Sequence, residues 1–166
     1  MAPFQRIHLS PGDEIPNNPQ HPVRLYRGAV DDPDPASALE ALFAANGWPP
    51  QWRDGVFDYH HYHSTAHEVL GCYAGQATLM IGGPDGEAID LSRGDVVMLP
   101  AGTGHKRVSA SADFAIVGAY PAGQDWDIVT DPADDAIRAR IAAVPVPECD
   151  PVTGAAFSSQ LASATS

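Results

Sequence analysis

Short runs in which apolar and polar residues alternate fill the middle of the chain, between Trp52 and Tyr120. Turn-forming clusters such as GGPDG and DLSRGD separate these runs. Alternation with a period of two is typical of half-buried β-strands. We therefore expect strands near residues 76–81, 87–91, 95–99 and 113–120. No helical pattern interrupts the series, which predicts antiparallel strands in a closed or sandwiched sheet.

A further alternating run begins at Gly55. Period two places one set of side chains on a single face: Phe57, Tyr59, His61 and His63. After a turn at residues 64–65, Glu68 is expected on the same face as Leu70 and Cys72. By the same alternation, His60 and His67 point away from this face.

Two helices are expected outside this region. Asp34 and Pro35 are a good cap and first residue for a helix at 36–46, which Asn46-Gly47 ends. A second helix is predicted to start near Asp131-Pro132. The proline-rich segment before the first helix predicts an irregular arm with one strand, Val23 to Ala29, and the tail from Val152 is expected to be weakly ordered.

Length and composition favour one domain, residues 1–166. Its expected parts are an arm with the first strand (1–35), a helix (36–46), a barrel core (52–121), and a helix with a tail (122–166). The formal net charge of −12 argues against nucleic acid as a partner. The absence of a signal-like or spanning apolar stretch favours a soluble, cytoplasmic protein with no membrane partner. Cys72 and Cys149 form no C-x-x-C pair, and both are expected to be structural thiols.

Four of the seven histidines lie within residues 60–67. His61 and His63, two apart on a strand, can direct both imidazoles at one ion, and Glu68 can add a carboxylate oxygen. A fourth ligand must come from elsewhere in the sheet. His105 follows the segment PAGTG, whose glycines permit a sharp approach of the backbone.

The spacing of these residues resembles the two motifs of the cupin superfamily. The first motif is met by Gly55, His61, His63, Glu68 and Gly75. The second is met by Gly94, Pro100, Gly102 and His105, and departs only at Ser109, where the pattern has Asn. Nine matches, each expected by chance about once in twenty, make coincidence negligible. Longer stretches, such as IPNNPQHPVRLYRG and VGAYPAGQDWD, are similar to single-domain bacterial cupins of the YjlB type.

The resemblance implies an all-β fold: the cupin double-stranded β-helix, an antiparallel jelly-roll barrel, with one or two short flanking helices. It also implies a metal site at His61, His63, Glu68 and His105. Three imidazoles and a carboxylate suit one divalent transition metal ion, Mn, Fe, Co, Ni, Cu or Zn, rather than Ca²⁺ or Mg²⁺.

The leading functional hypothesis is a metal-dependent enzyme, of the dioxygenase or isomerase type, acting on a small oxygen-rich molecule. The alternative is a binding or sensor cupin whose metal only holds a small-molecule ligand. Arg107, Tyr59 and Tyr120 are candidate substrate-binding residues, and Arg107 would suit a carboxylate. Trp48, Trp52 and Phe57 are expected to pack the first helix against the barrel. Exposed sheet edges favour a homodimer.

Overall fold

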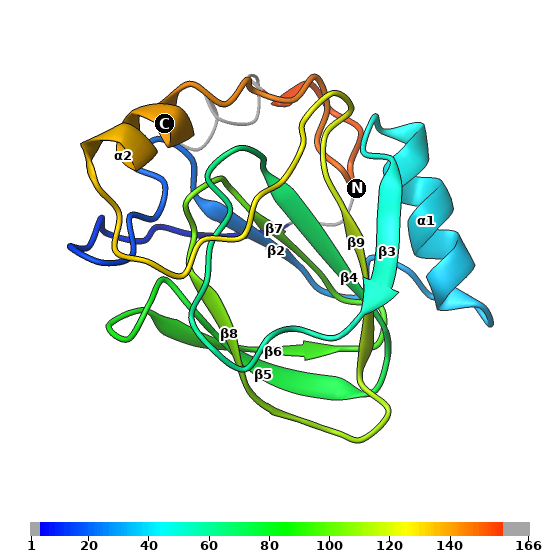
Figure 1. Ribbon diagram of the computed structural model, residues 1–166. Helices are drawn as coiled ribbons and strands as arrows, with labels where there is room; N and C mark the ends of the chain where they lie inside the picture. The colour runs from blue at the N-terminus through cyan, green and yellow to red at the C-terminus, as the bar shows by residue number, and fades with distance from the viewer. Residues whose placement is uncertain (1–3, 158–166) are drawn as a thin grey trace.

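The computed structural model describes residues 4–157, which form two antiparallel β-sheets with two helices outside them (Figure 1). The elements in chain order are β1 (Gln5–Ile7), β2 (Val23–Tyr26), α1 (Pro35–Ala45), β3 (Pro50–Asp54), β4 (Glu68–Ala74), β5 (Gln76–Ile81), β6 (Glu87–Ser92), β7 (Val96–Leu99), β8 (His105–Ala110), β9 (Ala115–Ala119) and α2 (Asp135–Ala142). The four strands expected from alternation at 76–81, 87–91, 95–99 and 113–120 are confirmed as β5, β6, β7 and β9.

The larger sheet has the strand order β1-β2-β7-β4-β9-β3, and the smaller has the order β6-β5-β8. Every strand pair in both sheets is antiparallel. The sheets face each other (Figure 1). The chain passes from one sheet to the other between β4 and β5, and then at each step from β6 to β9. This arrangement is the jelly roll of the cupin double-stranded β-helix, so the expected fold class is confirmed.

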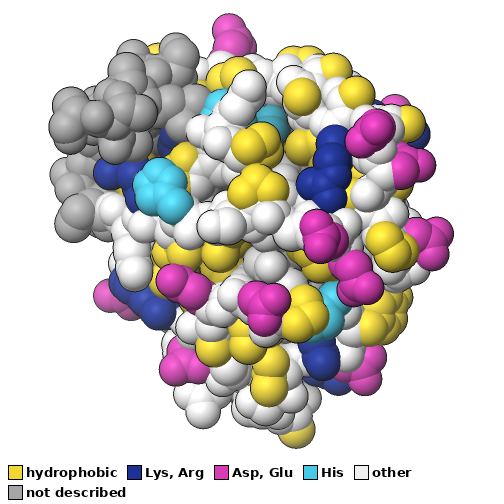
Figure 2. Space-filling model, turned by 90° about the vertical axis from the view of Figure 1, so that its left-hand side faces the viewer, with side chains coloured by type: hydrophobic (Ala, Val, Ile, Leu, Met, Phe, Trp, Pro, Cys, Tyr) yellow, Lys and Arg dark blue, Asp and Glu magenta, His cyan; other side chains and the backbone are white. Residues whose placement is uncertain are grey.

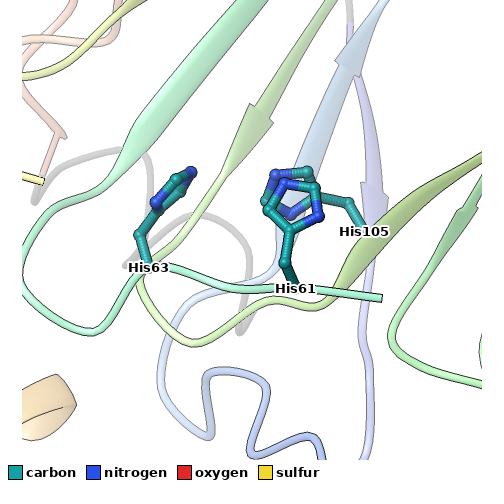
Figure 3. Close-up of side chains that lie close together, drawn as sticks. All are labelled: His61, His63 and His105. Carbon is teal, nitrogen blue, oxygen red and sulfur yellow. The ribbon is translucent and has the colours of Figure 1, made fainter. Parts of the chain in front are cut away.

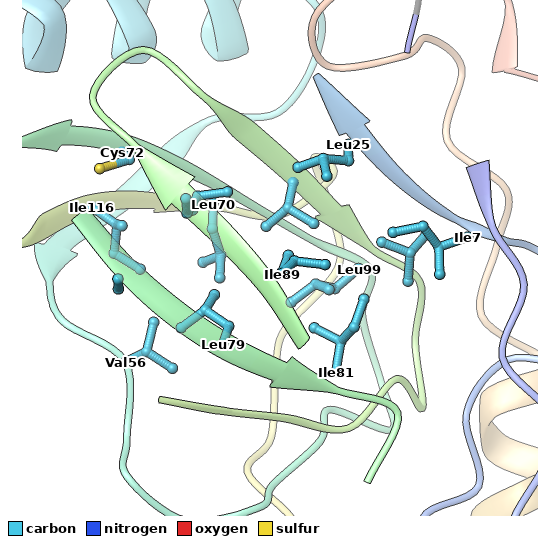
Figure 4. Close-up of a cluster of buried hydrophobic side chains, with 14 residues drawn as sticks. Ile7, Leu25, Val56, Leu70, Cys72, Leu79, Ile81, Ile89, Leu99 and Ile116 are labelled. Carbon is cyan, nitrogen blue, oxygen red and sulfur yellow. The ribbon is translucent and has the colours of Figure 1, made fainter. Parts of the chain in front are cut away.

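The space between the sheets is filled by the inward side of each strand (Figure 4). On β4, Leu70 and Cys72 point into this cluster, as the alternation predicts, whereas Val69 packs on the opposite side. Ile116 of β9 and Leu79 of β5 meet them from neighbouring strands. Burial raises the pKa of the Cys72 thiol to about 11, so this side chain behaves as a small buried hydrophobe.

A second hydrophobic cluster fixes α1 to the outer face of the larger sheet. Leu39 and Phe43 of α1 are fully buried there, and their side chains approach β4 at Gly71, where a Cβ would lie within about 3 Å of both. Trp48 completes this cluster, as expected. The helix start is also confirmed, because the Asp34 side chain accepts a hydrogen bond from the Ser37 amide.

Two expectations about the elements are wrong, and the short strand β1 was not expected. Residues 55–63 form no strand: only His61 and Tyr62 make isolated bridges, to His105 and Val129. α2 begins at Asp135, three residues later than Asp131-Pro132 suggests, because the Asp134 side chain caps it. The short strand β1 had no clear sequence signal, since three residues are too few to show a period.

The segment after Val152 is packed as far as the structure describes it, contrary to the expectation of a weakly ordered tail. Phe157 is buried in the helix-side cluster. The carboxylate of Asp150 lies 2.7 Å from the guanidinium of Arg24, and both side chains are fully buried. Asp150 also accepts hydrogen bonds from the Tyr26 hydroxyl and from two amides that follow it. The remaining predicted tail, residues 158–166, lies outside the described residues.

The surface is acidic, in keeping with the net charge of −12. On the face shown in Figure 2, acidic side chains are spread among uncharged and hydrophobic ones. Neither helix in the described part of the chain is long and apolar enough to cross a bilayer.

Candidate metal centre

A cavity of about 480 Å³ opens at one end of the space between the sheets. Its polar lining includes His61, His63, Glu68 and His105, which come from three separate parts of the chain. All four residues are buried, and none is more than 6% exposed. The structure therefore gathers the four predicted ligands around one space, and their role as ligands is a proposal that follows from the geometry below.

The three histidines present one ring nitrogen each to a common point (Figure 3). One nitrogen from each ring lies within 4.8 Å of the others. Backbone hydrogen bonds hold His61 beside His105: the His105 amide donates to the His61 carbonyl at 2.9 Å, and the reverse bond measures 3.2 Å. The rings of these two residues are 4.0 Å apart between centroids.

Each imidazole is oriented by a backbone carbonyl. Nδ1 of His61 lies 3.0 Å from the Tyr59 oxygen, Nδ1 of His105 lies 3.0 Å from the Thr103 oxygen, and Nδ1 of His63 contacts the Asp127 oxygen. A carbonyl only accepts, so each Nδ1 carries the proton and donates. In a neutral ring Nε2 then has a free lone pair, which is the form in which histidine binds metals.

Glu68, the first residue of β4, closes the set. Its Oε2 lies 3.1 Å from Nε2 of His63, and its Oε1 lies 3.2 Å from Nε2 of His105. Among the described residues, the buried His63 Nε2 and Glu68 Oε1 have no hydrogen-bond partner of good geometry. Buried polar atoms are rarely left so without a missing water or ion. The three imidazole nitrogens group together, and the Glu68 carboxylate lies beside two of them, those of His63 and His105. These ligand types fit a divalent transition metal ion.

The close packing of these groups changes their proton affinities. Burial, together with the neighbouring His105, lowers the pKa of His61 to about 3. Burial, the largest single cause, disfavours a charged His63, but the Glu68 carboxylate and Asp127 together outweigh it and raise the pKa of His63 to about 9. His63 and His105 in turn hold the pKa of Glu68 well below its usual range, despite the cost of burying its charge. Without a metal, His63 and Glu68 thus form an ion pair at neutral pH.

Tyr120, immediately after β9, holds the Glu68 carboxylate from the other side. Its hydroxyl donates to Oε2 at 2.6 Å, while Nε1 of Trp52 donates to the Tyr120 oxygen at 3.1 Å. Trp52 reaches this position because residue 118 on β9 is glycine, where a Cβ would lie 2.2 Å from the indole ring. Tyr120 also lines the cavity, so its bond to Glu68 leaves its expected role in substrate binding as a prediction.

The turn between His63 and β4 is fastened by Asp127. Its carboxylate accepts hydrogen bonds from the Ser64 amide at 2.6 Å and from the Thr65 hydroxyl at 3.1 Å. Arg140 of α2 donates to the Ser64 hydroxyl at 3.1 Å. The Asp127 carboxylate thus stabilises the turn, and its backbone carbonyl orients the His63 ring.

The other predicted residues lie in different surroundings. Arg107 lines the cavity, where its guanidinium is 4.0 Å from the Asp58 carboxylate. Tyr59 is exposed, stacks on Phe57, and is not among the residues that line the cavity. Phe57 does line it, so the expectation that Phe57 packs against α1 is wrong. Trp52 also lines the cavity and packs against the cluster between the sheets, not in the cluster that holds α1.

His67 is not an outer-face histidine as alternation suggests. It is 1% exposed, and its Nδ1 accepts a hydrogen bond from the Ala101 amide at 2.9 Å. It packs beside His21, away from the three clustered histidines. Alternation fails here because residues 64–67 form a turn and a loop instead of a strand.

Asp127 and Trp126 were missed because they lie outside both motifs. Trp126 stacks on Tyr120, with centroids 4.3 Å apart and planes 4° apart, and it lines the cavity. The one sequence signal was the stretch VGAYPAGQDWD, which contains both residues and carries the resemblance to YjlB-type cupins. Spacing arguments alone could not place this loop against the turn at Ser64.

Replacing Tyr120 by Phe is expected to lower the affinity for Zn²⁺ by about 10- to 100-fold, because the hydrogen bond that orients Glu68 is lost while the ring remains. Competition with a chelator of known affinity measures this. Tyr73→Phe, a half-buried tyrosine outside the cavity, is the control and is expected to bind Zn²⁺ as the parent does. An unchanged affinity in Tyr120→Phe would remove the assigned role of Tyr120.

The fold and the convergent histidines define a class: this is a cupin-fold protein with three histidines that could hold a metal ion. Among known proteins, the chain is similar to the uncharacterized protein YjlB of Bacillus subtilis (strain 168). The two sequences are 41% identical over 153 residues, which are 90% of each chain. The chain belongs to the same family as YjlB. A scan against protein-family models found no match.

Solved structures show weaker likeness. Acireductone dioxygenase from Bacillus anthracis, with a cadmium ion in its active centre, aligns at 17% identity and a TM-score of 0.41, over 57% of this chain and 63% of that one. A DUF861 family protein from Thermotoga maritima aligns at 19% identity and a TM-score of 0.35, over 58% and 96%. Oxalate decarboxylase aligns at 25% identity and a TM-score of 0.35, over 46% and 21%. At these scores the likenesses carry no argument about function.

Proposed function

We propose that the chain binds one divalent transition metal ion through His61, His63, Glu68 and His105. We further propose that it is an enzyme of the dioxygenase or isomerase type, acting on a small oxygen-rich molecule. The observation that carries the metal proposal is the grouping of three imidazoles, each with Nδ1 bonded to a backbone carbonyl, beside a buried carboxylate whose Oε1 has no hydrogen-bond partner of good geometry among the described residues.

The cavity supports an enzyme because the four groups face open space. When bound, such an ion with unfilled coordination positions polarises substrate oxygens or exchanges electrons. The chain's own residues supply the rest of the site. Tyr120 holds Glu68, Asp127 holds His63 and its turn, and Arg107 places a positive charge at the wall of the same cavity.

Titration of the metal-free protein with Zn²⁺ tests the proposal. We expect one ion per chain and the release of about one proton per ion at pH 7. The sign follows from His63: its pKa of about 9 means that it carries a proton at pH 7, which the ion must displace from Nε2. His61, with a pKa of about 3, has none to release above pH 5. The apparent affinity should therefore rise with pH, by about one decade per unit, up to about pH 9.

Calorimetry in two buffers with different ionisation enthalpies counts the protons, and chelator competition between pH 6.5 and 8 gives the slope. Binding of less than one ion per three chains would contradict the metal site. Stoichiometric binding with no proton release would exclude His63 as a ligand. Turnover is tested separately, by oxygen uptake and product analysis on the metal-loaded protein.

A further inference from the structure

Exposed apolar side chains gather at the mouth of the metal cavity. Phe57, Trp126 and Ile128 are 45%, 39% and 50% exposed, and all three line the cavity. They make up half of the six large hydrophobic side chains that are exposed in the described part of the chain. Apolar groups concentrated around one opening, with polar groups converging beneath them, are typical of a ligand site.

Each of the two aromatic side chains at the mouth, Phe57 and Trp126, stacks on a neighbouring tyrosine. Trp126 lies flat on Tyr120, whose hydroxyl binds Glu68. Phe57 lies on Tyr59, with centroids 4.9 Å apart and planes 14° apart, and its ring also meets His61 nearly edge-on at 5.1 Å. The aromatic surfaces of the mouth are thus joined directly to groups of the metal site.

Polar groups occupy a different part of the cavity. The histidine nitrogens and Glu68 are buried, whereas Arg107 lies at a wall with its side chain 39% exposed. A bound divalent ion and Glu68 would together carry one net positive charge, and Arg107 adds another. Two carboxylates, Asp54 and Asp58, also line the cavity, but both residues are exposed, so water screens their charge more than that of the buried groups. Asp58, the partner of Arg107 at 4.0 Å, is 72% exposed, so the pair is weak and screened by water. An anionic, oxygen-bearing group is therefore favoured inside the cavity, and a flat apolar group at its mouth.

We propose, on the basis of the proposed metal site, that the substrate is a small aromatic acid. Its adjacent oxygens, such as a carboxylate with a neighbouring hydroxyl or keto group, face the metal and Arg107. Its ring lies against Phe57, Trp126 and Ile128. This division of the cavity selects an aromatic acid over an aliphatic acid that has the same oxygens.

Mandelate and lactate test this directly, because both are 2-hydroxy acids and differ only in a phenyl group where lactate has a methyl group. Binding to the Zn²⁺-loaded full chain, followed by calorimetry and by tryptophan fluorescence, is expected to be at least about tenfold tighter for mandelate. Hexahydromandelate, with a cyclohexyl ring, is expected to bind more weakly than mandelate, since it cannot stack. Equal binding of mandelate and lactate, or of mandelate and hexahydromandelate, would overturn the proposal.

Variants of the residues at the mouth test where the ring of the bound ligand lies. Trp126→Ala and Ile128→Ala should reduce the preference for mandelate over lactate severalfold while leaving one Zn²⁺ per chain. Val146→Ala is the control for Ile128→Ala, because Val146 is 48% exposed and lies outside the cavity. If the Ile128 and Trp126 variants kept the full preference for mandelate, the mouth would not be a ring-binding surface. The same would follow if these variants changed only the oligomeric state of the protein.

The outcomes also separate this proposal from the one on which it rests. Failure to bind Zn²⁺ would overturn the proposed metal site itself. One Zn²⁺ per chain with no preference for mandelate would leave that site intact and overturn the aromatic substrate. Arg107→Gln gives a further check: it should weaken mandelate and lactate by the same factor, because Arg107 is assigned to the carboxylate that both share.

Discussion

Replacing His63 by Ala is expected to lower the affinity for Zn²⁺ by more than about 100-fold, and to leave protein purified without chelator nearly free of metal. Loss of residues that only orient a ligand costs about 10- to 100-fold, so loss of a ligand should exceed that range. His63 suits the test because its Nε2 is buried, has no hydrogen-bond partner of good geometry among the described residues, and lies 3.1 Å from Glu68. Elemental analysis and chelator competition measure the effect.

The fold should survive this change, since the hydrophobic cluster between the sheets does not include His63. His60→Ala is the matched control: it removes a half-buried histidine three residues away that does not line the cavity. We expect the control to bind one ion per chain. Full metal content in His63→Ala would show that the ligand assignment is wrong, and failure of that variant to fold would show that the site is structural.

Replacing Asp150 by Ala is expected to destabilise the protein by about 3–5 kcal/mol, because it leaves the buried guanidinium of Arg24 without the carboxylate 2.7 Å away. The Tyr26 hydroxyl and the amides of Val152 and Thr153 lose an acceptor at the same time. Urea unfolding followed by circular dichroism measures the change in the free energy of unfolding.

A surface ion pair supplies the comparison for Asp150→Ala. The carboxylate of Glu40 pairs with Arg53 at 2.7 Å, but both side chains are partly exposed to water. Glu40→Ala should therefore have a much smaller effect on unfolding, since solvent screens the pair. A loss in Asp150→Ala no greater than in Glu40→Ala would mean that the Arg24 network adds little to stability.

Local sequence patterns predicted α1 and the strands β5, β6, β7 and β9, whereas β3 and β8 were not predicted. Alternation of apolar and polar residues has a period of two wherever one side of a strand is buried, so β5, β6, β7 and β9 could be recognised without the structure. Asp34, Pro35 and Asn46 marked the ends of α1 because capping chemistry is local. The candidate metal residues were also recognisable, since the two motifs place three histidines and one glutamate at fixed intervals.

How those four side chains meet, and what surrounds them, depends on the packing of segments far apart in the sequence. Residues 55–63 alternate in sequence but form no strand. Their only bridges in the described part of the chain are isolated ones, from His61 to the first residue of β8 and from Tyr62 to Val129. The carbonyl that orients His63 belongs to Asp127, and the hydroxyl that holds Glu68 belongs to Tyr120; these contacts join residues 64 and 52 positions apart. No local pattern records such contacts, since chain folding alone brings the partners together.

The same reason explains the Arg24–Asp150 pair and the aromatic mouth of the cavity. Arg24 and Asp150 are 126 residues apart and each looks like an ordinary surface residue in sequence, yet both are fully buried. Phe57 and Trp126 are residue types common in protein cores. Here both lie in loops that line the cavity, and both are exposed. The sequence pattern predicts whether a side chain is buried or exposed. Which residues it contacts depends on how segments far apart in the sequence pack together.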